Sequence, residues 1–151
     1  ESCLLLFFTG MERNASELLS DQDNKSRSAD AAMLQNLHKT KEIGLLTRRY
    51  LENGQLEMLG ELFHEHWENK KKRSPGMSDP KIDECYELAL KEGALGGKLI
   101  GAGGGGFLMF YCQNGRKSKL IQAMQKVGLR WERFRFDHDG AKLLVNTFTR
   151  N

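Results

Sequence analysis

The most unusual chemical feature of this sequence is a run of small residues, Gly101-Ala102-Gly103-Gly104-Gly105-Gly106. Eight of the 16 glycines fall between Gly93 and Gly106. Glycine accepts positive φ angles, so successive backbone N–H groups can turn toward one point and bind an anion such as phosphate. A glycine-rich hairpin that serves only close packing is the alternative. Four successive glycines exceed what a turn needs, and we therefore favour a phosphate or ligand contact.

Two lysines could add positive charge to this site. Lys98 precedes the glycine run, and Lys71 belongs to the basic segment Lys70–Arg73. Ammonium groups bind phosphate and carboxylate, so we assign Lys98 and Lys71 to the same candidate site as Gly101–Gly106. A solvated helix end, favoured by the helix dipole, is the alternative for the basic segment. A solvent-exposed strand lysine is the alternative for Lys98.

The context of the glycine run excludes a dinucleotide-binding loop. The run contains the pattern GxGxxG, but such a loop opens a helix, whereas Phe107–Cys112 has the apolar and aromatic composition of a strand. A P-loop is excluded because Leu99 stands where that motif needs Ser or Thr after its lysine.

Metal-binding patterns are weak in this chain. His64 and His66 diverge on a helix, which favours a solvated helical face over a metal site, so we expect no metal ligand. The three cysteines are widely spaced and form no CxxC pair, which is typical of reduced thiols and predicts a cytoplasmic protein.

The elements that must position these residues follow from hydrophobic periodicity and from turn signals. An Asp79-Pro80 helix start and glycines after predicted helix ends fix several boundaries. The sequence predicts a strand at Cys3–Phe8, two or three helices between Asn14 and Trp67, a helix from Pro80 to Gly93, strands at Lys98–Ile100 and Phe107–Cys112, a helix from Leu120 to Val127, and strands at Arg130–Phe136 and Ala141–Phe148.

This order predicts one α+β domain over residues 1–151, with a ferredoxin-like, mostly antiparallel sheet of four to five strands and helices packed on one face. The chain is 39% hydrophobic and 28% charged, as expected of a globular domain. A net charge of +3 is too small to indicate a nucleic-acid or membrane partner, and no apolar run is long enough for a transmembrane span.

The stretch Gly93–Cys112 resembles the third conserved motif of the GHMP kinases, in the form found in sugar kinases that act on heptose 7-phosphate. Flanking segments agree with that group: Leu6–Gly10, Trp67–Lys71, Ser78–Asp83 and Phe136–Gly140. The resemblance covers nearly the whole chain. It implies the fold of the family's C-terminal domain, a glycine run beside the substrate and the transferred phosphate, and an ATP-dependent phosphotransferase whose acceptor is a sugar or sugar phosphate. We expect the anomeric hydroxyl of a heptose 7-phosphate as the acceptor.

The sequence lacks the family's N-terminal motif PxxxGLGSSA, its catalytic Asp and its Mg²⁺ ligands. The resemblance therefore implies no catalytic residue in this chain, and ATP and Mg²⁺ bound by the complete enzyme rather than by this inactive fragment. The implied partners are its own N-terminal ATP-binding domain and a sugar-phosphate substrate. A homodimer is a further candidate, because apolar surface would be exposed. The alternative is a stand-alone ferredoxin-like module that binds a ligand or partner without catalysis.

Overall fold

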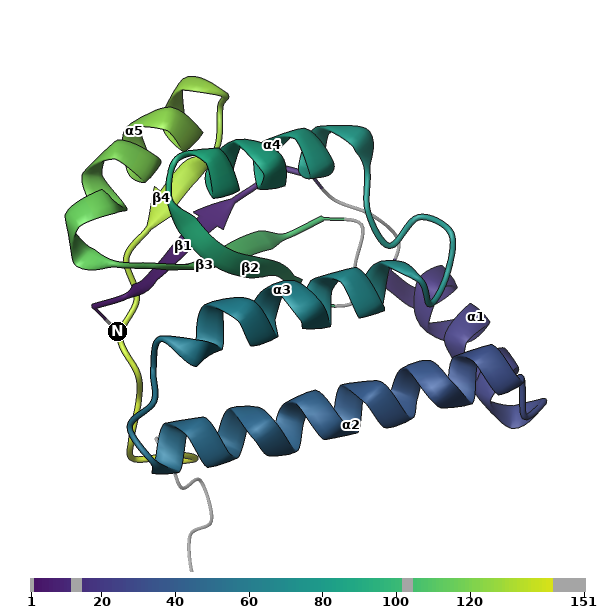
Figure 1. Ribbon diagram of the computed structural model, residues 1–151. Coiled ribbons are helices and arrows are strands. Elements are labelled where there is room, and N and C mark those ends of the chain that lie inside the picture. Colours follow the sequence, from purple (N-terminus) through teal and green to yellow (C-terminus); the bar gives the residue numbers. More distant parts are fainter. Residues whose placement is uncertain (1, 12–14, 102–104, 143–151) are drawn as a thin grey trace, which may run out of the picture.

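The computed structural model describes residues 2–11, 15–101 and 105–142 (Figure 1). In chain order, the elements of this part are β1 (Leu4–Phe8), α1 (Ala15–Arg27), α2 (Ala31–Glu52), α3 (Met58–Lys71), α4 (Pro80–Lys91), β2 (Ala94–Ile100), β3 (Phe107–Cys112), a 3₁₀ turn η1 (Asn114–Arg116), α5 (Lys117–Lys126) and β4 (Arg130–Glu132).

The four strands form one antiparallel sheet in the order β2-β3-β1-β4. Figure 1 shows α4 and α5 on one side of the sheet and α3 beside the end strand β2, with α2 packed beyond α3. The predicted α+β class and antiparallel sheet are confirmed. The glycine run connects β2 to β3, two neighbouring strands, at one end of the sheet.

Strand alternation explains where the core sits. Phe7 pairs with Leu108, and Leu108 pairs with Leu99, so these three side chains lie on the same face of the sheet and are fully buried. The apolar side of α4 and α5 covers that face. The core residues of the two helices are Ile82, Cys85, Tyr86, Ala89, Leu120 and Met124.

The helix boundaries follow the signals in the sequence. The Asp79 side chain accepts a hydrogen bond from the Lys81 amide at 2.9 Å, which caps the start of α4 ahead of Pro80. Gly93 and Gly128 follow α4 and α5 with φ angles of +105° and +89°. These predictions are confirmed.

The last strand differs from the prediction, because β4 ends at Glu132 instead of continuing to Phe136. Trp131 pairs with Phe7 and lies on the core face. By strand alternation, a longer β4 would place Arg133 and Arg135 over that face, where desolvation of two guanidinium groups opposes pairing. The predicted strand Ala141–Phe148 lies outside the described residues from position 143 onward, and residues 141–142 are not in a strand.

No helix in the described ranges is both long enough and apolar enough to cross a membrane.

Two glycines allow α3 to approach β2 closely. A Cβ atom at Gly96 would overlap the carbonyl group of Gly60 and lie 3.0 Å from the Cβ atom of His64. A Cβ atom at Gly60 would in turn overlap Leu95. This contact fixes the distance between α3 and the strand that leads into the glycine run.

We expect Gly96→Ala to lower the free energy of unfolding by about 1–3 kcal/mol, because the added methyl group must push one backbone away from the other. Urea denaturation of the chain measures this change. Gly115→Ala is the matched control, since nothing lies within 4 Å of a Cβ atom at Gly115. Equal stabilities for the two variants would contradict the close contact between α3 and β2.

Candidate anion-binding site

Lys70 lies in the last turn of α3 and connects this helix to the start of the glycine run. Its side chain points toward β2 and is only 6% exposed. The ammonium group donates hydrogen bonds to the carbonyl oxygens of Leu99 at 3.1 Å and Gly101 at 2.5 Å. Burial, together with the charges of Arg73 and Lys98, lowers the pKa of Lys70 to about 8.

Arg73 follows α3 and is held by polar side chains of α2. Its Nε atom donates to the side-chain oxygen of Asn36 at 2.8 Å, and its Nη2 atom donates to the hydroxyl of Thr40 at 2.6 Å. Asn36 is buried, and its side-chain amide also donates to the Asn69 carbonyl at 2.5 Å. This network fixes the guanidinium group in place, and burial lowers the pKa of Arg73.

Lys98 and His66 complete a group of basic side chains. The Lys98 ammonium lies 5.8 Å from the centre of the Phe63 ring. Burial and the charge of Arg73 lower the pKa of Lys98. Burial, and then the charges of Lys98, Arg73 and Lys70, lower the pKa of His66 to about 4, so His66 is neutral at pH 7.

These four side chains line one pocket of about 300 Å³ between α1, α3 and the end of β2, which we call the cationic pocket. Its remaining lining residues are Leu19, Gln22, Leu99, Ile100 and Gly101. No acidic residue lines it, and within the described ranges neither Lys70, Arg73 nor Lys98 pairs with a carboxylate. At physiological pH this pocket therefore combines a high positive potential with partial exclusion of water, which favours an anionic ligand.

Gly101, Gly105 and Gly106 are the members of the glycine run that the structure describes. Gly101 lines the cationic pocket, is exposed, and has a φ angle of +99°. The Gly106 amide donates to the Met11 carbonyl at 3.1 Å, and the Gly106 carbonyl accepts from the Thr9 amide at 2.9 Å. Gly106 therefore anchors the end of the run to the segment after β1, and its N–H group is not available to a ligand.

Gly105 also lies against that segment, because a Cβ atom there would overlap the Met11 carbonyl. Ala102, Gly103 and Gly104 lie outside the described residues. Anion binding by the main chain of the run stays a prediction.

Of the two lysines assigned from the sequence, Lys98 lines the cationic pocket and Lys71 does not. The Lys71 ammonium pairs with Glu68 at 2.7 Å, lies 4.0 Å from the Asp83 carboxylate, and lies 5.7 Å from the centre of the Trp67 ring. Two carboxylates thus neutralise Lys71 on the α4 side of α3, and the structure does not bring it together with the glycine run.

Sequence reasoning selected the basic segment Lys70–Arg73 but chose Lys71 from it instead of Lys70 and Arg73, and it did not assign His66 to the site. The expected end of the helix near Trp67 left the basic segment in a loop, but α3 continues to Lys71. With the helix extended, His66 and Lys70 are four residues apart and share one side. The expected solvated face for the two histidines is also wrong, since His64 bonds the Tyr86 hydroxyl at 2.9 Å and His66 lines the pocket.

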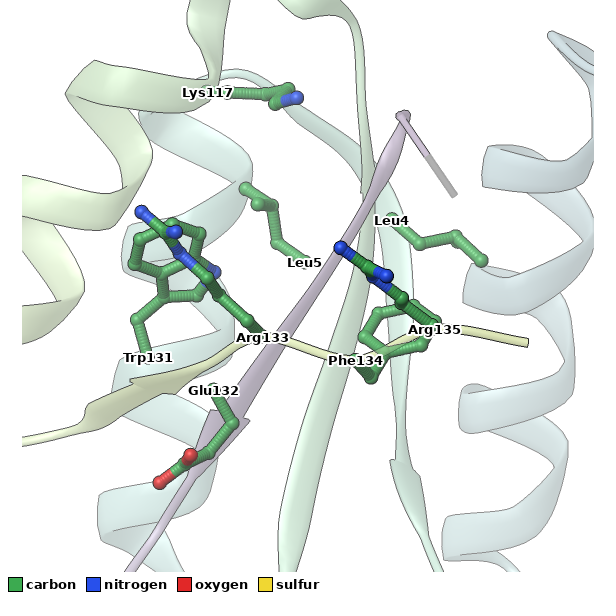
Figure 2. Close-up of a pocket in the computed structure, with 8 residues that line it drawn as sticks. All are labelled: Leu4, Leu5, Lys117, Trp131, Glu132, Arg133, Phe134 and Arg135. Carbon is green, nitrogen blue, oxygen red and sulfur yellow. The ribbon is translucent and has the colours of Figure 1, made fainter. Parts of the chain in front are cut away.

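A second pocket of about 490 Å³ lies at the opposite edge of the sheet, beside β1 and β4 (Figure 2). Figure 2 shows Arg133 next to Trp131, and the guanidinium carbon lies 5.1 Å from the ring centre. Glu132 contributes a carboxylate to the lining and pairs with Arg130. The lining combines three basic side chains, Lys117, Arg133 and Arg135, with that carboxylate, and β1 and β3 separate this pocket from β2.

The described residues contain no group of three or more His, Cys, Asp or Glu side chains that could hold a metal ion. The cationic pocket in particular has no carboxylate to bind Mg²⁺.

The fold and the site together define an α+β domain with a cationic pocket beside the glycine-rich connection between two strands. A sequence model of the family described as GHMP kinases C terminal matches residues 47–129, more than half of the chain. The chain belongs to this family. The match includes α3, β2, the glycine run and Arg73.

Individual relatives agree with this assignment. D-glycero-alpha-D-manno-heptose 7-phosphate kinase of Campylobacter jejuni is 29% identical over 94% of this chain and 41% of its own length. A structure titled D-glycero-D-manno-heptose 1-phosphate kinase from Bacteroides thetaiotaomicron is 26% identical, with a TM-score of 0.53 over 87% of this chain and 32% of that one. The chain thus spans about two fifths of the length of the first relative and about a third of the second.

The fold is shared more widely. L. major mevalonate kinase, solved with R-mevalonate, matches with a TM-score of 0.74 at 18% identity, over 82% of this chain and 37% of that one.

The lowered pKa of Lys70 predicts a pH dependence of stability. Between pH 8 and 10.5 the folded chain has lost the Lys70 proton, whereas the unfolded chain still holds it. The folded state binds fewer protons in this window, so the contribution of Lys70 makes the free energy of unfolding rise with pH.

We expect the stability difference between wild type and Lys70→Met to shift in favour of the wild type across this window. With allowance for solvent screening, the shift is on the order of 1–3 kcal/mol. Urea denaturation of both proteins at a series of pH values measures this shift. Subtraction of the variant's free energy of unfolding from that of the wild type largely cancels the contributions of Tyr86 and the cysteines. A difference that is independent of pH would contradict the burial of a charged Lys70.

Proposed function

We propose that this chain is the C-terminal, substrate-side domain of an ATP-dependent kinase that transfers a phosphoryl group to a hydroxyl of a sugar or sugar phosphate. The observation that carries the proposal is the cationic pocket, which shares Gly101 with the glycine run. Family membership supports phosphoryl transfer as the chemistry, and the pocket supports an anionic substrate.

The acceptor that we propose is a manno-heptose 7-phosphate, phosphorylated at its anomeric hydroxyl. Two relatives whose names describe heptose phosphate kinases support this substrate class.

Phosphoryl transfer depends on alignment of the acceptor with the γ-phosphate and on stabilisation of charge, which is mainly a positioning task. In our proposal the residues of this chain hold and orient the acceptor. Mg²⁺ and ATP would bind to the N-terminal part of the complete enzyme, where the metal would supply neutralisation of charge on the transferred phosphate. The isolated chain would then be inactive. The complete enzyme would act in the cytoplasm.

The partner of this domain in the proposal is the N-terminal ATP-binding domain of the same polypeptide. The glycine run lies between them, so each domain supplies one side of the reaction centre. The apolar side chain of Ile100, which is 38% exposed, lies at the end of β2 that leads into the glycine run, and Leu95, which is 41% exposed, lies near the other end of the same strand. They support a contact with another folded surface, and a second copy of the chain is the alternative occupant.

Replacement of Gly101 tests the role of the glycine run in the complete enzyme. Gly101→Ala strains a backbone with a φ angle of +99°, although a Cβ atom would meet nothing within 4 Å. We expect kcat for heptose 7-phosphate to fall by about tenfold or more, because a shifted loop misaligns the reactants. The isolated chain should show no turnover with ATP, Mg²⁺ and the same acceptor.

Gly54→Ala is the matched control. Gly54 has a φ angle of +70°, is equally open, and lies in the turn between α2 and α3. Both variants should lose a similar amount of stability, about 1 kcal/mol, but only Gly101→Ala should lose activity. Equal kcat values for the two variants would show that the glycine run is not part of the reaction centre. Turnover by the isolated chain would refute the proposal that ATP and Mg²⁺ bind to a separate N-terminal domain.

A further inference from the structure

We propose that the cationic pocket binds the phosphate group that the acceptor already carries, which makes the substrate of this domain a phosphomonoester rather than a free sugar. This inference rests on the proposed function and assigns Lys70, Arg73 and Lys98 to a part of the acceptor that does not react. The glycine run is left to the phosphate that is transferred.

The first argument is the missing negative charge. Three basic side chains meet in one partly buried pocket, and each contributes to a lowered pKa of a neighbour. Buried charges are normally paired, because desolvation is otherwise too costly. Among the described residues no carboxylate supplies the counter-charge, so a ligand with two negative charges is the group that would complete the pocket.

The second argument is the arrangement of hydrogen-bond donors. Lys70 uses two of its three N–H groups on the carbonyls of Leu99 and Gly101, which leaves one for a ligand. Arg73 uses two of its five N–H groups on α2, and the only partner of the Lys98 ammonium among the described residues is the Phe63 ring. A tetrahedral phosphate presents several acceptor oxygens to such converging donors.

The third argument separates the acceptor from the nucleotide. The phosphates that react in a kinase are bound together with Mg²⁺, and Mg²⁺ sites use carboxylate oxygens. The cationic pocket has none. Lys70 and Arg73 are also held by hydrogen bonds to β2 and α2, which suits a group that stays in place while another part of the molecule reacts.

Binding to the 151-residue chain tests the pocket without any requirement for catalysis, because every lining residue belongs to this chain. We would titrate the chain with D-mannose 6-phosphate, D-mannose and inorganic phosphate by isothermal calorimetry at pH 7. We expect the phosphate ester and inorganic phosphate to bind and D-mannose not to bind. Lys98→Gln should raise the dissociation constant of the ester about tenfold through loss of one charged contact.

Lys81→Gln is the control, since Lys81 is an exposed lysine on α4 outside the pocket. It should leave the dissociation constant unchanged. Arg73→Gln should weaken binding as Lys98→Gln does, but it also breaks contacts to α2, so Lys98→Gln decides the outcome. Failure of the ester to bind, or equal affinities of wild type and Lys98→Gln, would overturn the proposal.

The pH profile of binding provides an independent readout. The charged groups that face the Lys70 ammonium are Arg73 and Lys98, and His66, with its pKa lowered to about 4, is neutral at pH 7. Affinity should fall above about pH 8, where Lys70 loses its proton, and below about pH 6, where a phosphate ester becomes a monoanion. Constant affinity from pH 7 to pH 9.5 would contradict a contact between Lys70 and the phosphate.

Kinetics of the complete enzyme then identify which phosphate is bound. If the pocket holds the acceptor, Lys98→Gln raises KM for the sugar phosphate about tenfold and leaves KM for ATP unchanged. A higher KM for ATP alone would assign the pocket to the nucleotide and overturn the inference. If the chain binds phosphate esters but the complete enzyme phosphorylates no sugar, the proposed function fails while the pocket stands as an anion site.

Discussion

The close approach of α3 to β2 is the constraint on which the site depends. Gly60 and Gly96 let the helix and strand backbones meet without intervening side chains, and the depth of this contact determines how far Lys70 reaches. Its ammonium group arrives at the carbonyls of Leu99 and Gly101, where β2 ends and the glycine run begins. The close packing at Gly60 and Gly96 therefore sets the position of the Lys70 ammonium, and this group in turn holds the start of the glycine run.

Much of the fold could be predicted from local signals. The Asp79-Pro80 start of α4 and the strand Phe107–Cys112 need only capping chemistry and apolar runs, and both agree with the structure. The end of β4 could not be predicted in this way. Alternation from Arg130 to Phe136 suits a strand in isolation, but the register against β1 determines which residues face the core, and that register is a tertiary property.

The sequence predicted an anion-binding site, but it predicted only some of the residues that line it. Lys98 and the glycine run stand out because of their composition and spacing. The choice of lysine within the basic segment depends on helical phase, because Lys70 faces β2 whereas its immediate neighbour Lys71 pairs with Glu68. Asn36 could not be predicted from the sequence. Its role is to accept a hydrogen bond from Arg73, and this contact exists only in the folded structure.

The free-energy cost of the pocket connects stability to binding. Burial of Lys70 among other cations disfavours the folded chain at neutral pH, and an apolar residue of similar size would avoid this cost. A dianionic ligand removes the repulsion and binds only the folded state, so it stabilises the chain as its concentration exceeds the dissociation constant. The same charges therefore lower the stability of the ligand-free domain and raise the affinity for an anion. Hydrogen bonds to β2 and α2 hold Lys70 and Arg73 in place, so these side chains do not turn toward solvent when no ligand is bound.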